Sequence, residues 1–285
     1  MVLRQRPAAP LSRYVDCLWF SARAALPHTR ERFLPTGCAD IVIPLLQQHL
    51  VRYDGVDDTQ GRRLRGAIVQ GPFDRFGVRG TEGASAVVGV HFTPGGAAAF
   101  FGGALPELRN RTALLEDLWG STARELHERL QAAETPREAL WRLHEQLLQR
   151  LHAAAPPDLL ADFAIAAFRR DPACARVEPV QRTSGCTPAQ FIRRFEMAVG
   201  LTPKRYARVL RMGVLLPQLL RSGPRDWAQI AAGGGFFDQS HLIREFRHLA
   251  GIAPGAYTPT EADRPTHVAL ATPKNLSNTA GLRIA

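Results

Sequence analysis

The sequence contains few of the features that stabilise or anchor an exported protein. It has only four cysteines, and none of them shows the CxxC spacing of a metal site: Cys17, Cys38, Cys174 and Cys186. A chain of 285 residues can bury enough apolar surface to fold without disulfides, so we expect free thiols. No hydrophobic run approaches the roughly 18 residues of a membrane span, and the first residues do not resemble a signal peptide. We therefore predict a cytoplasmic protein that does not enter a membrane.

The motifs of several enzyme classes are also missing. None of the nine histidines has another histidine two positions away, which is a common spacing in metal-binding cupins. Neither a GxSxG nucleophile motif nor a GxxxxGK[ST] phosphate-binding motif occurs. We therefore expect no enzymatic activity, no metal and no cofactor. His91, on a predicted strand, is expected to point into a ligand pocket or to meet a polar partner, and Cys38 is expected to be buried and inert.

Lysine is nearly absent, but the chain is still strongly basic. Only two of its 36 basic residues are lysines, and its formal net charge is +10. Residues 177–257 hold eleven Arg and Lys against five Asp and Glu, whereas residues 1–156 hold nineteen against sixteen. A basic segment of this kind is typical of a module that binds a polyanion.

This basic segment contains an internal repeat. Residues 191–206 have the sequence FIRRFEMAVGLTPKRY, and residues 242–257 have the sequence LIREFRHLAGIAPGAY. Six of the sixteen positions are identical at a constant offset of fifty-one residues. Each unit predicts a short amphipathic helix that carries an exposed arginine and ends at a glycine. Two copies in one chain indicate two related binding units for one elongated target.

Each repeat unit completes a predicted helix-turn-helix. In the first, Thr187 and Gln190 form a capping box after a tight turn at Gly185. In the second, a short helix from Trp227 is followed by a glycine turn and by a helix that Asp238 caps. Both second helices have one apolar face and one face with arginine, which is the pattern of a DNA-binding helix-turn-helix.

A third predicted helix connects the two units. It extends from Pro203 to about Leu220 and would be about 27 Å long. Successive major grooves on one side of B-DNA lie about 34 Å apart. A helix of this length could hold the two units in adjacent grooves of one DNA segment.

These residues resemble a known family. The segment GGFFDQSHLIREFRHLAGIAPGAY, which ends at Tyr257, resembles the C-terminal signature of the AraC/XylS transcriptional regulators, and GLTPKRYARVLR at 200–211 resembles their first unit. The resemblance covers residues 157–258 and implies double-stranded DNA as the partner, with two helix-turn-helix units in consecutive major grooves. By position it implies these DNA-facing residues: Arg193, Gln239, Ser240, Ile243 and Arg244, with His241 near a phosphate.

The two units differ in the residues available to contact bases. Gln239 and Arg244 have the donor geometry that suits adenine and guanine edges, whereas Ser240 suits a phosphate. In the first unit, Ala189 and Ile192 replace polar groups with apolar ones. We therefore predict that the second unit specifies the sequence and that the first mainly holds the DNA backbone. Pro217, inside the connecting helix, should cost about 3 kcal/mol unless a kink is accommodated.

The N-terminal part predicts a β-rich sensing domain over residues 1–155, with two helices at 122–153. Its segments at 14–19, 33–40 and 89–96 resemble the cupin-like domains found before such DNA-binding modules. The resemblance implies a sensing role and does not identify what is sensed. The expected fold is α+β: an N-terminal cupin-like barrel or sandwich with helices, and a C-terminal all-α domain of two helix-turn-helix units joined by a linker helix.

Two further predictions concern the helix at 136–153 and the tail. Leu140, Leu143, Leu147, Leu148 and Leu151 form one apolar stripe, which is usually part of a domain core and is otherwise a dimer surface. We predict a homodimer through 136–153. Residues 259–285 are polar and lack a period, so we expect a disordered tail.

The sequence therefore favours a DNA-binding transcriptional regulator that responds to a small-molecule effector. Two alternatives stay open. One is a non-enzymatic ligand-binding or protein-interaction module with a decayed first helix-turn-helix, which would bind random duplexes equally. The other is a metal-dependent cupin enzyme, which a metal analysis would test.

Overall fold

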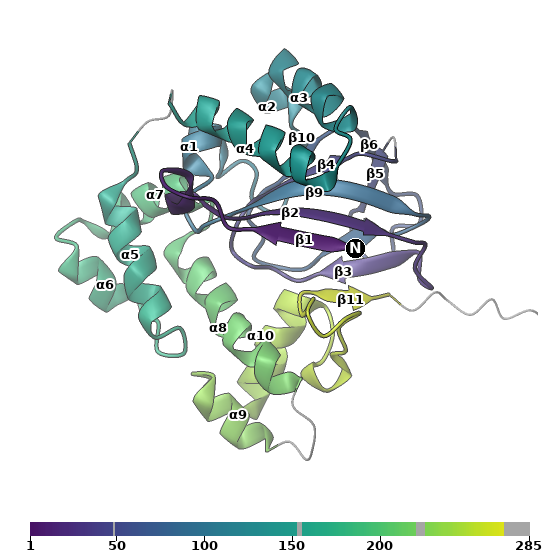
Figure 1. Cartoon of the computed structure of the whole chain (residues 1–285). Helices are drawn as coiled ribbons and strands as arrows, with labels where there is room; N and C mark the ends of the chain where they lie inside the picture. The colour runs from purple at the N-terminus through teal and green to yellow at the C-terminus, as the bar shows by residue number, and fades with distance from the viewer. Residues whose placement is uncertain (48, 153–155, 221–225, 271–285) are drawn as a thin grey trace, which may run out of the picture.

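The protein combines a sheet-rich N-terminal part with a helical C-terminal part. The computed structural model describes residues 1–47, 49–152, 156–220 and 226–270. Two antiparallel sheets form the first part, with one strand supplied by residues 267–269, and six helices form the second, so the predicted α+β fold class is confirmed (Figure 1). Within the described ranges, no helix is long and apolar enough to cross a membrane.

The two sheets are made of short strands. The first sheet has six strands in the order β1-β2-β9-β4-β7-β10, with these bounds: β1 Val2–Gln5, β2 Val15–Arg23, β9 Ser85–Phe92, β4 Asp40–Pro44, β7 Ile68–Gln70 and β10 Thr112–Leu114. The second has five strands in the order β11-β3-β8-β5-β6, with these bounds: β11 His267–Ala269, β3 Arg30–Phe33, β8 Gly77–Gly80, β5 His49–Tyr53 and β6 Arg62–Arg65. Short 3-10 turns supplement them: η1 Leu11–Arg13, η2 Gly102–Ala104 and η3 Pro254–Ala256.

Each face of the first sheet has its own surroundings, because successive side chains of a strand point to opposite faces. On β2, Leu18 and Phe20 lie in the largest apolar core, together with leucines of the helices that cover this face. Between them, Trp19 points to the other side and lines a cavity. The covering helices lie on one side of this sheet in Figure 1: α1 Ala98–Phe101, α2 Glu116–Trp119, α3 Ser121–Gln131 and α4 Pro136–Leu151.

The leucine stripe of α4 belongs to this core and is not a free surface. Leu140, Leu143 and Leu147 are buried against the first sheet, and Leu148 and Leu151 pack at its margin. The sheet needs this cover because its outer face carries apolar side chains on every strand that crosses its centre. The prediction of a homodimer through 136–153 is therefore wrong about the surface that would form the dimer, since these leucines already have partners within the chain.

The C-terminal part contains six helices, and the last five correspond to the two predicted helix-turn-helix units and the helix that connects them. Their bounds are α5 Leu159–Arg170, α6 Val177–Thr183, α7 Pro188–Val199, α8 Pro203–Leu219, α9 Trp227–Gly233 and α10 Gln239–Ala250. Their apolar faces meet in a second core around Phe195, Tyr206 and Phe246. Pro217 lies in the last turn of α8, which ends two residues later at Leu219. Proline has no amide hydrogen, so α8 lacks the backbone bond that this position would make to the Gly213 carbonyl, and the expected cost of about 3 kcal/mol stays a prediction.

The tail after the last helix is structured where it is described. β11 pairs with β3, the Leu34 amide donates to the Thr266 carbonyl over 2.7 Å, and the Leu270 amide donates to the Arg30 carbonyl over 3.0 Å. The expectation of disorder over 259–285 is therefore wrong for the part up to residue 270. The unpaired edge of β3 offers backbone groups that a distant strand can satisfy, and a polar sequence does not reveal such a partner. Residues 271–285 lie outside the described residues.

Candidate nucleic-acid interface and ligand cavity

The second helix-turn-helix holds α10 rigidly by one face. Asp238 Oδ1 accepts a hydrogen bond from the His241 amide over 2.7 Å and so caps the helix. Gly235 makes the turn with a φ of +73°, a conformation that side-chain-bearing residues rarely adopt. Leu242 and Phe246 are buried beneath the helix. The polar face of α10 is thereby fixed toward solvent.

Three of the predicted contact residues of α10 lie on that exposed face: Gln239, Ser240 and Arg244. Arg247, one turn further on, is also exposed. No described residue forms a hydrogen bond or ion pair with the side chains of Arg244 and Arg247. The face therefore presents donors that are free to meet an external partner.

The other two predicted residues of this unit are only half-exposed. The Nδ1 atom of His241 accepts a hydrogen bond from the Phe237 amide over 3.2 Å, and its ring meets Phe236 edge-on at 5.5 Å. His241 thus helps to close the turn. Ile243 packs against the apolar core of the helices. Phe237 was not among the predicted contact residues, although its side chain is 91% exposed at the turn directly before α10.

The first unit has the predicted frame but a different surface. The capping box of α7 is present, with Thr187 and Gln190 bonded in both directions. Arg193 is exposed and pairs with no described residue, whereas Arg194 makes a two-bond contact of 2.9 and 2.8 Å with Asp158, the N-cap of α5. Ile192 is exposed on α7, as the sequence indicated. This outer face is less polar than that of α10.

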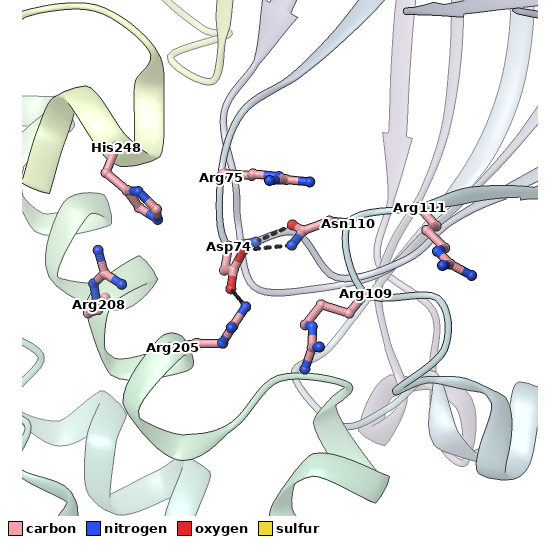
Figure 2. A pocket seen from close by; sticks show the side chains of 8 residues that line it. All are labelled: Asp74, Arg75, Arg109, Asn110, Arg111, Arg205, Arg208 and His248. Carbon is pink, nitrogen blue, oxygen red and sulfur yellow. Dashed lines mark hydrogen bonds and ion pairs between the residues drawn. The ribbon is translucent and has the colours of Figure 1, made fainter. Parts of the chain in front are cut away.

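The connecting helix α8 is fixed to the second unit and to the sheets. Arg208 donates to Glu245 of α10 through two bonds of 2.6 and 3.1 Å. At the first turn of α8, Arg205 pairs with Asp74, a buried residue of the N-terminal part (Figure 2). Asn110 closes this junction, because its Nδ2 donates to Asp74 Oδ1 over 2.7 Å and its Oδ1 accepts from the Asp74 amide over 3.0 Å.

Burial opposes the ionisation of Asp74, but the hydrogen bonds from Asn110 and Arg205 outweigh it and hold the pKa of this carboxyl below its usual range. Figure 2 also shows the arginines around the junction. They line a polar cleft of about 490 Å³. Arg109 is engaged there with Glu196 of α7 over 2.8 Å. The cleft is therefore a seam between the two parts of the chain, held by paired charges.

A larger cavity of about 670 Å³ lies between the two sheets. Its walls carry apolar side chains from both sheets and polar groups from β4, β5, β8 and β9. Residues 263–267, which follow the last helix of the chain, complete the wall. The cavity is thus built by the N-terminal part and closed by the C-terminal segment.

His91 meets both expectations for it, because it lines this cavity and has a polar partner. Its Nδ1 atom lies 2.6 Å from Asp40 Oδ1. The charge of Asp40 raises the pKa of His91 well above its usual value, against the opposing effect of burial. Cys38, which is buried, lies beside this pair and also favours the protonated ring. His91 and Asp40 therefore form a charged pair in the cavity wall.

A second charged group, missed by the sequence analysis, surrounds Glu31 on β3. Glu31 is 1% exposed, and its carboxylate accepts from Arg79 Nε over 2.6 Å. His28 Nε2 and His267 Nδ1 approach the same carboxylate at 3.2 and 3.3 Å. Burial opposes its ionisation, but Arg79 and His267 together hold the pKa of Glu31 far below its usual range. Only the pairing of β3, β8 and β11 brings these residues together.

The part of the chain that the structure describes contains no group of three or more metal-ligating side chains suited to a metal ion.

Comparison with known proteins gives matches for both parts of the chain. Residues 3–113 match a family described as a domain of unknown function (DUF6597), and residues 181–259 match a family described as a helix-turn-helix domain. Among solved structures, ToxT from Vibrio cholerae is similar, with a TM-score of 0.44 and 11% identity over 84% of this chain and 97% of that chain. A structure of wild-type ToxT with unsaturated fatty acid bound gives a TM-score of 0.45 and 11% identity over 84% and 94%. No curated protein matches the sequence.

Proposed function

We propose that the protein is a sequence-specific DNA-binding transcriptional regulator and that its helix-turn-helix domain is of the AraC type. The exposed polar face of α10 carries this proposal. Gln239, Ser240 and Arg244 project from a helix whose opposite face is buried, and Arg244 has no partner among the described residues. Free donors on a rigid helix are what recognition of base edges in the major groove requires.

The residues of α10 would divide between base and backbone contacts. Gln239 and Arg244 contact adenine and guanine edges, and Ser240 contacts a phosphate. His241 uses Nδ1 within the turn, so only its other ring nitrogen is available to a phosphate. The exposed part of Ile243 suits a thymine methyl group.

The first unit would hold the DNA more than it specifies the sequence. Among the described residues of α7, Arg193 is the cation without a partner, and the neighbouring Arg194 is occupied by Asp158. A single arginine contact to the backbone positions the protein without selecting bases. The expected operator therefore has most of its specified bases in one half.

The N-terminal part would act as the sensor for a small-molecule effector. Its cavity is large enough for a small ligand and has apolar walls with a few polar groups. The segment that closes the cavity and the ion pair at Asp74 both connect it to the helical part. Occupancy of the cavity can thereby influence how the two helix-turn-helix units are held.

Selection of bound duplexes from a random pool, followed by gel-shift titration on the best one, tests the proposal. Arg244→Ala should lose about 1–3 kcal/mol of binding free energy and relax specificity at one base position. The control is Arg137→Ala, which removes an exposed arginine from α4 and should bind as the wild type does. Equal binding of all duplexes would instead favour a module that does not recognise sequence.

A further inference from the structure

The cavity between the sheets contains a buried cation whose charge has no partner in the part of the chain that the structure describes. Arg52 lies on β5, lines the cavity and is only 8% exposed. Its Nη1 atom donates to the Val51 carbonyl over 3.1 Å, while its Nε atom has no hydrogen-bond partner among the described residues. Its guanidinium lies 5.9 Å from the ring centre of Phe33, which is a weak cation–π contact. Among the described residues, no carboxylate forms an ion pair with it.

The carboxylates near Arg52 are committed to other cations. Glu31 forms an ion pair with Arg79, and Asp40 forms one with His91. The strand register places Arg52 directly opposite Arg79, so two guanidinium groups are neighbours across the sheet. Among these five groups, Arg52, Arg79 and protonated His91 exceed Glu31 and Asp40 by one positive charge, and Arg23, a half-buried arginine of the same cavity wall, adds another. Burial and the nearby Arg79 lower the pKa of Arg52 to about 9, which still leaves it charged at neutral pH.

An excess buried cation of this kind lowers the stability of the fold. A charge removed from water without a counter-ion is unfavourable, and like charges on directly opposite strand positions repel each other. The acidic residues at the rim of the cavity do not relieve it, because Asp16, Glu82 and Asp263 are exposed and their charges are screened by water. A bound anion would remove the imbalance.

The rest of the cavity indicates what that anion carries. Its volume of about 670 Å³ is far larger than a carboxylate group needs. Six apolar side chains line the same cavity as Arg52: Trp19, Phe33, Val42, Leu50, Phe73 and Val87. Walls of this kind bind an apolar body, while a single fixed charge orients the ligand.

We propose that this cavity binds a small organic monocarboxylate with an apolar body, and that the Arg52 guanidinium is the group that pairs with its carboxylate. A planar guanidinium can hold a carboxylate through two parallel hydrogen bonds. Pro265 and Thr266 of the C-terminal segment line the same cavity, so the ligand contacts both parts of the chain. The inference that this ligand is the effector rests on the proposed function. The inference that the cavity binds such a ligand does not.

Calorimetric titration of the full chain tests the proposal with two acids and their neutral analogues. The probes are 4-phenylbutyrate and octanoate, each beside its primary amide. At least one acid should bind roughly tenfold or more tightly than its amide, because hydrogen bonds to charged groups are stronger than neutral ones. Equal affinity of each acid and its amide, or no acid binding at millimolar concentration, overturns the proposal.

Substitution of Arg52 assigns the binding to this residue. Arg52→Gln should weaken acid binding roughly tenfold or more, and Arg52→Lys should retain part of it, since the charge is kept and the planar fork is lost. The control is Arg65→Gln, which changes an exposed arginine of the adjacent strand β6 outside the cavity wall and should leave binding unchanged. Unchanged binding by Arg52→Gln contradicts the proposal.

Measurements of thermal stability and of DNA binding distinguish a failure of the ligand proposal from a failure of the proposed function. Ligand-free Arg52→Met should melt at the wild-type temperature or above it, because a hydrophobic side chain replaces an unpaired buried charge. A clear fall in melting temperature would show that Arg52 supports the fold and would contradict the ligand role. Without probe, Arg52→Gln should shift the selected operator as the wild type does. Loss of operator binding by every variant and by the wild type would count against the proposed function and leave the calorimetric result standing.

Discussion

Single glycines form the turns of the two helix-turn-helix units under different constraints. Gly235 has a φ of +73°, and a Cβ added there would lie 1.8 Å from the backbone oxygen of Ala173. Gly185, in the first unit, has a φ of +68°, and a Cβ added there would meet nothing within 4 Å. The turn at Gly235 therefore packs directly against the backbone of a neighbouring segment, whereas the turn at Gly185 has free space around it.

This difference predicts unequal effects of two alanine substitutions. Gly185→Ala should lower the free energy of unfolding by about 1 kcal/mol, the cost of the positive φ alone. Gly235→Ala should lower it by about 3 kcal/mol or more, because a clash with backbone atoms adds to that cost. Urea denaturation of both variants measures the difference. Equal losses would contradict the close approach of this turn to Ala173.

The pair of His91 and Asp40 predicts a pH dependence. The pKa of His91 is raised by Asp40, so the stabilisation from this pair is fully present below the unfolded value of about 6.5. It is lost as the pH rises above that value through the folded pKa. The difference in unfolding free energy between the wild type and His91→Gln should therefore shrink as the pH is raised from about 6 to 9. A difference that stays constant or grows over this range would contradict the assignment.

At the scale of elements, β11 is a strand that joins a sheet formed by residues far earlier in the chain. It pairs with β3 and places His267 beside Glu31. Val268 and Leu270 are buried by this docking. The strand thus completes both the sheet and the wall of the cavity.

Truncation tests the role of β11. A chain that ends at Pro259 should lose about 3 kcal/mol of unfolding free energy, because it no longer buries two apolar side chains. The Leu34 amide, which donates to Thr266, should also exchange its hydrogen faster. A chain that ends at Leu270 keeps β11 and serves as the control. Equal stability of the two truncated chains would show that β11 contributes nothing to the fold.

At the scale of the whole molecule, ion pairs connect the sheet-rich part to the helical part. Asp74 pairs with Arg205, Arg109 with Glu196 over 2.8 Å, and Arg13 with Asp162 over 2.6 Å. Of these carboxylates, only Asp74 is buried. The Asp74 pair is therefore the contact least screened by water and the one most able to couple the two parts.

A double-mutant cycle on Asp74→Asn and Arg205→Gln measures that coupling. We expect a coupling energy of about 1 kcal/mol, because Asp74 is buried while Arg205 is partly exposed. The same cycle on the exposed pair Arg6 and Asp16, which lies within the N-terminal part, should give about 0.5 kcal/mol or less. Equal coupling in the two cycles would indicate that the Asp74 pair does not fix the junction.

The features predicted correctly from the sequence depend on residues close together along the chain. The capping box at Thr187, the cap at Asp238 and the periodicity of α7 and α10 each depend on contacts within one helical turn. The exposed face with Gln239, Ser240 and Arg244 follows from that periodicity. The role of these residues in contacting DNA stays a prediction.

The features missed depend on contacts between distant segments. The leucines of α4 and the strand β11 could each be either exposed or docked on the rest of the chain. The local sequence pattern is the same in both cases, so it cannot distinguish them. The lack of a partner for Arg52 likewise follows only from the register of β3, β5 and β8, which commits Glu31 to Arg79.

The sequence by itself thus determined the helix-turn-helix units, their caps and turns, and the polar face of α10, because helices are specified by residues three or four positions apart. Only the tertiary structure decided which apolar stripe is core, which segment closes the cavity and which buried charge is left unpaired. These outcomes depend on strand pairing between segments separated by up to hundreds of residues, which burial and hydrogen bonding select and no local pattern records.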